Sequence, residues 1–278
     1  MAHRKAFNIF EVPFPMFEVK ADVGRIKYNK LWIKGLTTRL RVQEDHQVFP
    51  DTLGMQIADG AIGMRGTLNG TNPEKIYFRS RIRVNDIDLE KLMIKLDHFG
   101  QDLVINKNIK GRLTGNIRSH VQLHPDFVPL MSDTKAELDV AIYNGSLVDF
   151  APMQAVAGYF KDKNLRNVRF DTLRNKLTFT NGQLLIPTMN INSSLGFMEI
   201  SGKQSLDLKM EYYMRIPMKM VTKVGFQAIF GRKEAEVDLE QVDEIEYRDK
   251  DKKVRFMNVK VTGTPEDFKV GLGKAKKS

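Results

Sequence analysis

The strongest constraint on the fold is an unbroken alternation of apolar and polar residues over positions 206–218, which read LDLKMEYYMRIPM. Successive side chains of a β-strand point to opposite faces, so this period of two predicts a half-buried strand. At roughly 3.3 Å per residue the strand would run about 43 Å, whereas typical strands have about five or six residues. Its apolar face would carry Leu206, Leu208, Met210, Tyr212, Met214, Ile216 and Met218.

The side chains of this apolar face must be shielded from water. Burial of one such side chain is worth about 1.5–3 kcal/mol, so the face as a whole is worth roughly 10–20 kcal/mol. A second sheet could cover it as an ordinary core, or the face could line an elongated groove for an apolar ligand. Methionine has a flexible side chain that suits a variable ligand, which makes Met210, Met214, Met218 and Met220 candidate groove lining.

The rest of the chain repeats the same alternation in shorter runs separated by turn residues, which predicts an antiparallel meander. Asn or Asp followed by Gly accepts the positive φ angles of a tight hairpin turn. We expect such turns at Asp59-Gly60, Asn69-Gly70 and Asn181-Gly182, a further turn at Lys34-Gly35, and a strand that ends before Asn144-Gly145. The first strand is expected at residues 7–10 and the last at 268–272.

Helical spacing of apolar residues predicts about three short amphipathic helices among the strands. They are expected after Asn85-Asp86 up to Gly100, from Pro152 to Phe160, and over residues 221–230. The polar face of the first mixes Lys91 and Lys95 with acidic residues, which favours a helix that plugs the end of a sheet over one that contacts a membrane. The fold class is therefore mainly β with few helices.

The composition limits the class of protein. With 278 residues and 42% hydrophobic content, the chain can form one large β domain or two ordinary ones. A net charge of +10 predicts attraction to anionic surfaces, either nucleic acid or the phosphates of a membrane. No cysteine is present, which rules out disulfides, thiolate metal ligands and a cysteine nucleophile.

The N-terminal sequence has no apolar run of signal-peptide length, and no window of the chain reaches the roughly 18 apolar residues of a membrane-spanning helix. The chain starts almost directly in strand-like sequence. We interpret it as a fragment of a longer protein.

No motif for catalysis or a cofactor is found, so we expect no enzyme, no metal site and no cofactor. His120 and His124 would lie roughly 13 Å apart on a strand, too far to share one ion. The acidic run at 234–247 is interpreted as a solvated strand face opposite a basic strand. Residues 271–274 resemble part of a phosphate loop but have no helix behind them.

An arginine stripe on one predicted strand is a candidate contact for nucleic acid. Arg79, Arg81 and Arg83 share a face with Tyr77, and arginines can bind phosphates. Single-strand binders usually add several aromatic stacking platforms, and only Tyr77 is in register here. We interpret the stripe as a solvated strand face.

Residues 82–220 resemble the C-terminal region of AsmA-like proteins, relatives of TamB and of the bridge-like lipid-transfer proteins. The resemblance rests on an ordered series of short pieces rather than on one motif. These pieces are Tyr143-Asn144-Gly145, Phe170-Asp171-Thr172-Leu173, Leu177-Thr178-Phe179-Thr180-Asn181-Gly182, Ile186-Pro187, Asn192-Ser193-Ser194-Leu195-Gly196 and Ile200-Ser201-Gly202.

The resemblance implies a long, curved antiparallel sheet, shaped like a groove or taco, in a periplasmic protein of the Gram-negative envelope that is anchored in the inner membrane. The apolar face would carry phospholipid acyl chains toward the outer membrane. This chain departs from the family by lacking the N-terminal membrane helix. The candidate groove lining is Leu138, Val140, Ile142, Leu177, Phe179, Leu206, Leu208, Met210, Tyr212, Met214, Ile216 and Met218.

Three functions remain as hypotheses. The first is a lipid-conducting module, spanning 1–278 as one elongated sheet with an AsmA-like core at 82–220 and a C-terminal hairpin and last strand at 232–273. The second is an assembly factor for outer-membrane proteins that acts through an unpaired sheet edge. The third, nucleic-acid binding, rests only on net charge, and no nucleic-acid partner is expected.

Overall fold

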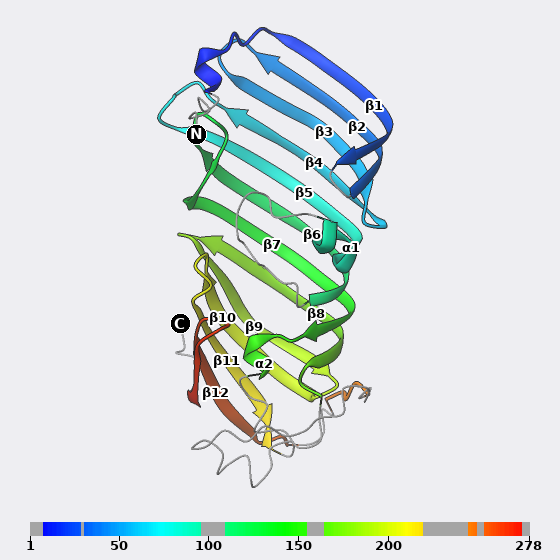
Figure 1. Cartoon of the computed structure of the whole chain (residues 1–278), viewed down its shortest axis with the longest axis vertical. Helices are drawn as coiled ribbons and strands as arrows, with labels where there is room; N and C mark the ends of the chain where they lie inside the picture. The colour runs from blue at the N-terminus through cyan, green and yellow to red at the C-terminus, as the bar shows by residue number, and fades with distance from the viewer. Residues whose placement is uncertain are drawn as a thin grey trace, which may run out of the picture. The chain divides into compact units, whose positions relative to one another are not determined.

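The computed structural model shows one open antiparallel β-sheet in which each strand pairs with its neighbours in the sequence (Figure 1). It describes residues 8–28, 31–95, 109–154, 164–218, 244–248 and 253–273. All the strands of this part belong to that one sheet, in the order β1 to β13. The predicted antiparallel meander is therefore confirmed.

The strands vary in length from five to twenty residues. They are β1 (Phe17–Tyr28), β2 (Leu31–Gln43), β3 (Gln47–Ile57), β4 (Gly60–Asn69), β5 (Ile76–Asp88), β6 (Ile109–Leu123), β7 (Pro129–Val148), β8 (Asn167–Thr180), β9 (Gln183–Ser193), β10 (Gly196–Ser205), β11 (Met210–Pro217), β12 (Phe256–Gly263) and β13 (Phe268–Leu272). The described helices are η1 (Ile9–Glu11), α1 (Leu89–Lys95) and α2 (Ala151–Gln154).

The chain divides into two compact units, which are described separately. Unit 1 consists of Met1–Asp97, Leu113–Val140 and Leu177–Gly182. Unit 2 consists of His98–Arg112, Ala141–Lys176 and Gln183–Ser278.

Two of the predicted hairpin turns are confirmed. Asp59, with a φ of 59°, joins β3 to β4, and Asn181, with a φ of 51°, joins β8 to β9. In contrast, Asn69-Gly70 opens a longer connection to β5, because the Asn69 side chain accepts hydrogen bonds from the backbone N–H and hydroxyl of Thr71. This local bonding replaces the tight turn.

The strands predicted to end at Lys34-Gly35 and at Asn144-Gly145 continue through these positions. Gly35 has a φ of 53° within β2, at a place where the register with β3 shifts. Asn144 has a φ of 48° within β7, which continues to Val148. Positive φ in a continuing strand is typical of a bulge, which bends the strand without ending it.

The long strand predicted at 206–218 is wrong in its first four residues. The strand β11 begins only at Met210, and the segment before it is the β10–β11 turn, where Leu208 has a φ of 61°. The backbone N–H of Ser205 donates to the carbonyl of Lys209 (2.9 Å) and closes the hairpin. The apolar–polar alternation of the sequence continues through this turn. The period of two therefore predicted a strand longer than the one observed.

The chain start also differs from the expected strand at 7–10. Residues Ile9–Glu11 form the 3-10 helix η1, capped by the Asn8 side chain, which accepts from the backbone N–H of Phe10 (3.0 Å). Helix α1 starts three residues later than the predicted cap at Asp86. Its first turn is capped by Asp88, whose carboxylate accepts from the backbone N–H of Lys91 (3.0 Å).

Some predictions lie outside the described residues. These are the remainder of the first helix beyond Lys95, the second helix beyond Gln154, the third helix at 221–230, Met220, and positions 232–243 and 249–252 of the C-terminal hairpin.

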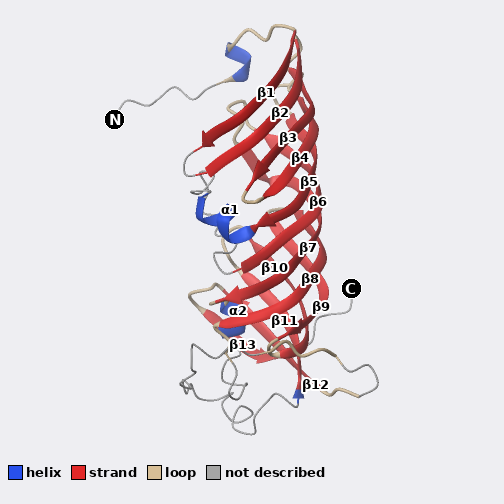
Figure 2. Ribbon diagram, turned by 90° about the vertical axis from the view of Figure 1, so that its right-hand side faces the viewer, coloured by secondary structure: helices blue, strands red, loops and turns tan. Residues whose placement is uncertain are grey.

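In unit 1 two apolar clusters form on one face of the sheet. In the first, Leu92 of α1 packs against a buried cluster that consists of Ile57, Ala58, Val84 and Ile87. In the second, Ile9 of η1 is 1% exposed and packs against Leu68 and Ile76. The two short helices therefore bury separate parts of this face, and Figure 2 shows α1 beside the single layer of strands. The predicted plugging of a sheet end by the first helix stays a prediction.

A glycine in β7 tests the packing of unit 2. A Cβ atom at Gly145 would lie 2.4 Å from the Phe170 ring and 2.5 Å from the Lys110 carbonyl oxygen. We expect Gly145→Ala to lower stability by about 1–3 kcal/mol, because the backbone must shift to accommodate it. Thermal unfolding followed by circular dichroism measures the change. Gly24→Ala, which would meet nothing within 4 Å, is the control, and equal melting temperatures for the two variants would contradict this packing.

Candidate functional site

Unit 1 has two chemically different faces, which β5 illustrates. Ile76 and Val84 are buried on one face, whereas Arg79, Arg81 and Arg83 are exposed on the other. Near the end of the strand, Asp86 has a φ of 52°, and this irregularity returns Ile87 to the buried side. We call these the apolar face and the basic face of unit 1.

The middle of the apolar face is less buried than the two clusters at its ends. Met64 of β4 stands opposite Leu53 of β3 and Ile82 of β5, and all three side chains are half-buried. Met64 and Leu53 belong to neither cluster. Unit 1 therefore presents aliphatic side chains that are partly open to solvent.

The predicted groove residues occupy different environments. In unit 1, Val140 is buried, and Leu138, Leu177 and Phe179 are half-buried. In unit 2, the side chains of Ile142, Met210, Tyr212, Met214 and Ile216 are buried, Leu206 and Leu208 are half-buried beside the β10–β11 turn, and Met218 is 37% exposed.

The apolar residues of β11 share one face, as the alternation predicted, and they are tightly packed. Met214 and Ile216 are each 1% exposed and stand opposite Val259 and Met257 of β12. The ring of Phe150 packs edge-on against Tyr212 at 6.0 Å, and burial raises the pKa of Tyr212 to about 12. A ligand would reach these side chains only if the packing of unit 2 opened.

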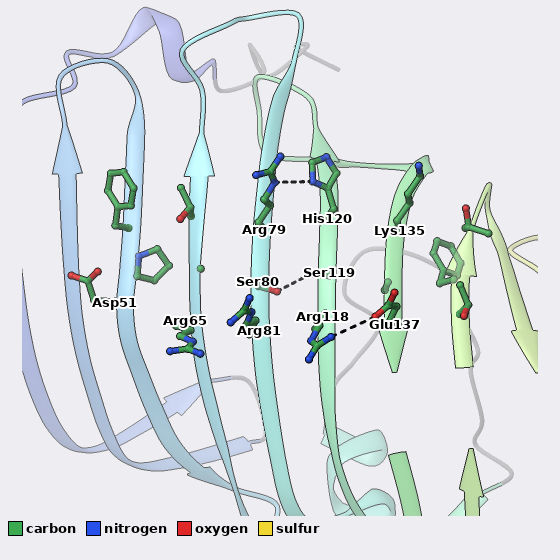
Figure 3. Close-up of a pocket in the computed structure, with 18 residues that line it drawn as sticks. Asp51, Arg65, Arg79, Ser80, Arg81, Arg118, Ser119, His120, Lys135 and Glu137 are labelled. Carbon is green, nitrogen blue, oxygen red and sulfur yellow. Dashed lines mark hydrogen bonds and ion pairs between the residues drawn. The ribbon is translucent and has the colours of Figure 1, made fainter. Parts of the chain in front are cut away.

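The basic face of unit 1 contains an open cleft of about 910 Å³ that crosses β3 to β8 (Figure 3). Its side chains form two rows. One row holds Arg79, His120 and Lys135, and the other holds Arg65, Arg81, Arg118 and Glu137. We call this the arginine cleft.

The second row places like charges next to one another. Arg65 of β4 and Arg81 of β5 are directly opposite in the strand register, and Arg118 follows on β6. Like charges opposite one another on paired strands are destabilising. Arg118 is 4.0 Å from Glu137, and both side chains are more than 70% exposed, so this ion pair contributes little.

The other acidic side chain of the cleft is already engaged. Asp51 accepts two hydrogen bonds from Arg41, at 2.6 and 2.7 Å, and this contact holds the pKa of Asp51 below its usual range. The cleft therefore has five cationic side chains and two carboxylates. Asp51 is paired with Arg41 outside the cleft, and Glu137 makes only a weak contact with Arg118.

The first row contains a neutral histidine held by its neighbours. His120 Nδ1 accepts a hydrogen bond from Arg79 Nε (3.2 Å), and its ring stacks on Tyr77 at 5.1 Å. Burial, and then the charges of Arg79 and Lys135, lower the pKa of His120. Among the described residues, no three His, Asp or Glu side chains gather where they could hold a metal ion.

Sequence reasoning found only one strand of this site. It identified Arg79, Arg81 and Arg83 but not their neighbours Arg65 and Arg118, which come from adjacent strands. Each of these arginines occupies an outward position of an alternating strand, and only the strand register shows that they are neighbours.

Comparisons with models of known protein families, with curated proteins and with solved structures found no match. Within the described residues, no helix has both the length and the apolar character needed to cross a membrane.

The charge environment of His120 can be tested by NMR. Since burial, and then the charges of Arg79 and Lys135, disfavour the imidazolium, we expect the pKa of His120 to lie below the usual 6.5 and to rise in Arg79→Gln. A pH titration of the imidazole resonances measures both. Arg83→Gln, on the same face of β5 but outside the cleft, should leave the pKa of His120 unchanged. A His120 pKa that does not respond to Arg79→Gln would contradict the described geometry.

Proposed function

We propose that this chain is an envelope module that binds phospholipid acyl chains along the apolar face of its sheet and conducts them between the inner and outer membranes. The observation that carries the proposal is the row of half-buried aliphatic side chains on unit 1, around Met64 and Ile82, between parts of the face that η1 and α1 bury. The groove shape of the sheet and the periplasmic setting belong to the proposal and derive from the resemblance to AsmA-like proteins.

The chemistry of this surface suits an acyl chain. Leucine, isoleucine and methionine offer no hydrogen bonds, and Met64 can adapt its flexible side chain to ligands of different shape. Each methylene removed from water contributes about 0.8 kcal/mol, so a chain lying along several strands would gain substantial free energy without specific contacts. No catalytic step is part of this function.

Site-specific photocrosslinking tests the proposal. With a photoreactive amino acid in place of Met64, we expect crosslinks to co-purifying phospholipid, because this side chain is on the half-exposed apolar face. The matched control carries the same amino acid in place of Asn85, which is exposed on the opposite face of β5, outside the arginine cleft. Mass spectrometry identifies the adducts.

Two outcomes would contradict acyl-chain binding. One is lipid-free protein with no lipid adduct at Met64, and the other is equal adduct yield at Met64 and Asn85. The second would indicate non-specific contact with detergent or lipid rather than a binding face.

A second function, assembly of outer-membrane proteins, is favoured by one feature of β1. Within the described part, β1 pairs only with β2, and Phe17 and Val19 on it are 45% and 37% exposed. An unpaired strand edge can accept a strand from a client protein. Crosslinks to protein from Val19, without lipid adducts from Met64, would favour this function over the first.

A further inference from the structure

We propose that the arginine cleft of unit 1 binds the phosphate groups of an anionic lipid surface. The cleft is on the face opposite the acyl-chain site, and the proposal does not depend on that site. It concerns the charged side chains of β4 to β7, with Arg65, Arg81 and Arg118 as its centre.

The positive charge at the centre of the cleft is uncompensated. Arg65 and Arg81 are in direct register, and neither has an acidic partner among the described residues. Such an arrangement costs stability in the unliganded protein. An anion placed between the two guanidinium groups would convert this repulsion into attraction.

The spacing of the strands suits a bound phosphate. Adjacent strands are about 4.8 Å apart, so arginines on successive strands can approach one tetrahedral phosphate from two sides. The planar guanidinium donates two parallel hydrogen bonds to phosphate oxygens, which makes arginine better suited to this role than lysine. The half-buried hydroxyl of Thr67, opposite Arg79 in the register, adds a neutral donor at the edge of the cleft.

The aromatic residues near the cleft favour a lipid surface over single-stranded nucleic acid as its ligand. Nucleic-acid binders of this kind need aromatic rings on which bases stack. Here the Tyr77 ring is stacked on His120, with Arg79 over it at 4.8 Å, and the Phe49 ring lies under Arg41 at 5.1 Å. Phe179 is the one further phenyl ring in the lining of the cleft, which is too few for a series of stacked bases. The exposed arginines can instead contact headgroup phosphates, whose negative surface potential attracts basic clusters.

Vesicle flotation tests the proposal with two charge-matched triple variants of the full chain. One replaces Arg65, Arg81 and Arg118 with Gln. The other replaces Lys34, Lys75 and Lys269 with Gln, which are exposed cations outside the cleft. Phosphatidylcholine vesicles with and without phosphatidic acid are the probes. We expect the cleft variant to lose about tenfold or more in affinity for the anionic vesicles, and the control variant to lose much less.

Thermal melting separates loss of binding from loss of folding. Because the substitutions remove repulsion between neighbours, the cleft variant should melt at the same temperature as the unmodified chain or higher. A cleft variant that melts lower would overturn the charge argument itself.

Three binding results would overturn the proposal. Equal loss in both triple variants would show that only net charge matters. Stabilisation by inorganic phosphate that requires the arginines, without vesicle binding, would assign the cleft to a free phosphate compound. Tighter binding to single-stranded DNA than to vesicles, again dependent on the arginines, would assign it to nucleic acid. Lipid adducts at Met64 are measured in a separate experiment. A negative vesicle-binding result would therefore overturn only the phosphate site, and the acyl-chain proposal would still depend on the crosslinking result.

Discussion

The alternation of side chains along each strand is the constraint on which the rest of this structure depends. In a sheet of sequential hairpins, strand register aligns equivalent positions of neighbouring strands, so the pattern of one strand extends across its unit. Thus Met64 meets Ile82 on the apolar face while Arg65 meets Arg81 on the basic face, one residue further along. A slip of one residue would exchange the two faces, which makes register a requirement for function as well as for stability.

Local irregularities preserve this assignment rather than disturb it. The positive φ of Asp86 returns Ile87 to the buried side of β5, where it packs with α1. Gly35 and Asn144 play comparable parts within β2 and β7, since each lets a long strand continue through a bulge. The same residue types therefore serve as turns at some places and as bulges at others, depending on whether the following residues find a partner strand.

The sequence was sufficient for the mainly β class, the meander order and the turns at Asp59-Gly60 and Asn181-Gly182, because these follow from local periodicity and backbone preferences. It was insufficient for the start of β11, since the turn around Leu208 continues the alternating pattern.

The arginine cleft was missed for a different reason. Its members Arg65 and Arg118 are far apart in sequence, and only the paired register of several strands brings them together. Burial of the predicted β11 lining also depends on tertiary packing that periodicity does not encode.

In our two proposals, unit 1 offers acyl chains its apolar face and phosphate groups its basic face. The most direct test of this division uses the absence of native cysteine to attach a fluorophore at adjacent positions, in Leu53→Cys and Thr52→Cys, whose side chains lie on the apolar and the opposite face. The measurement is quenching by a short-chain phospholipid with brominated acyl chains, at concentrations below micelle formation. We expect strong quenching at position 53, opposite Met64, and little at position 52. Equal quenching at the two positions, or none at 53, would contradict acyl-chain binding on the apolar face.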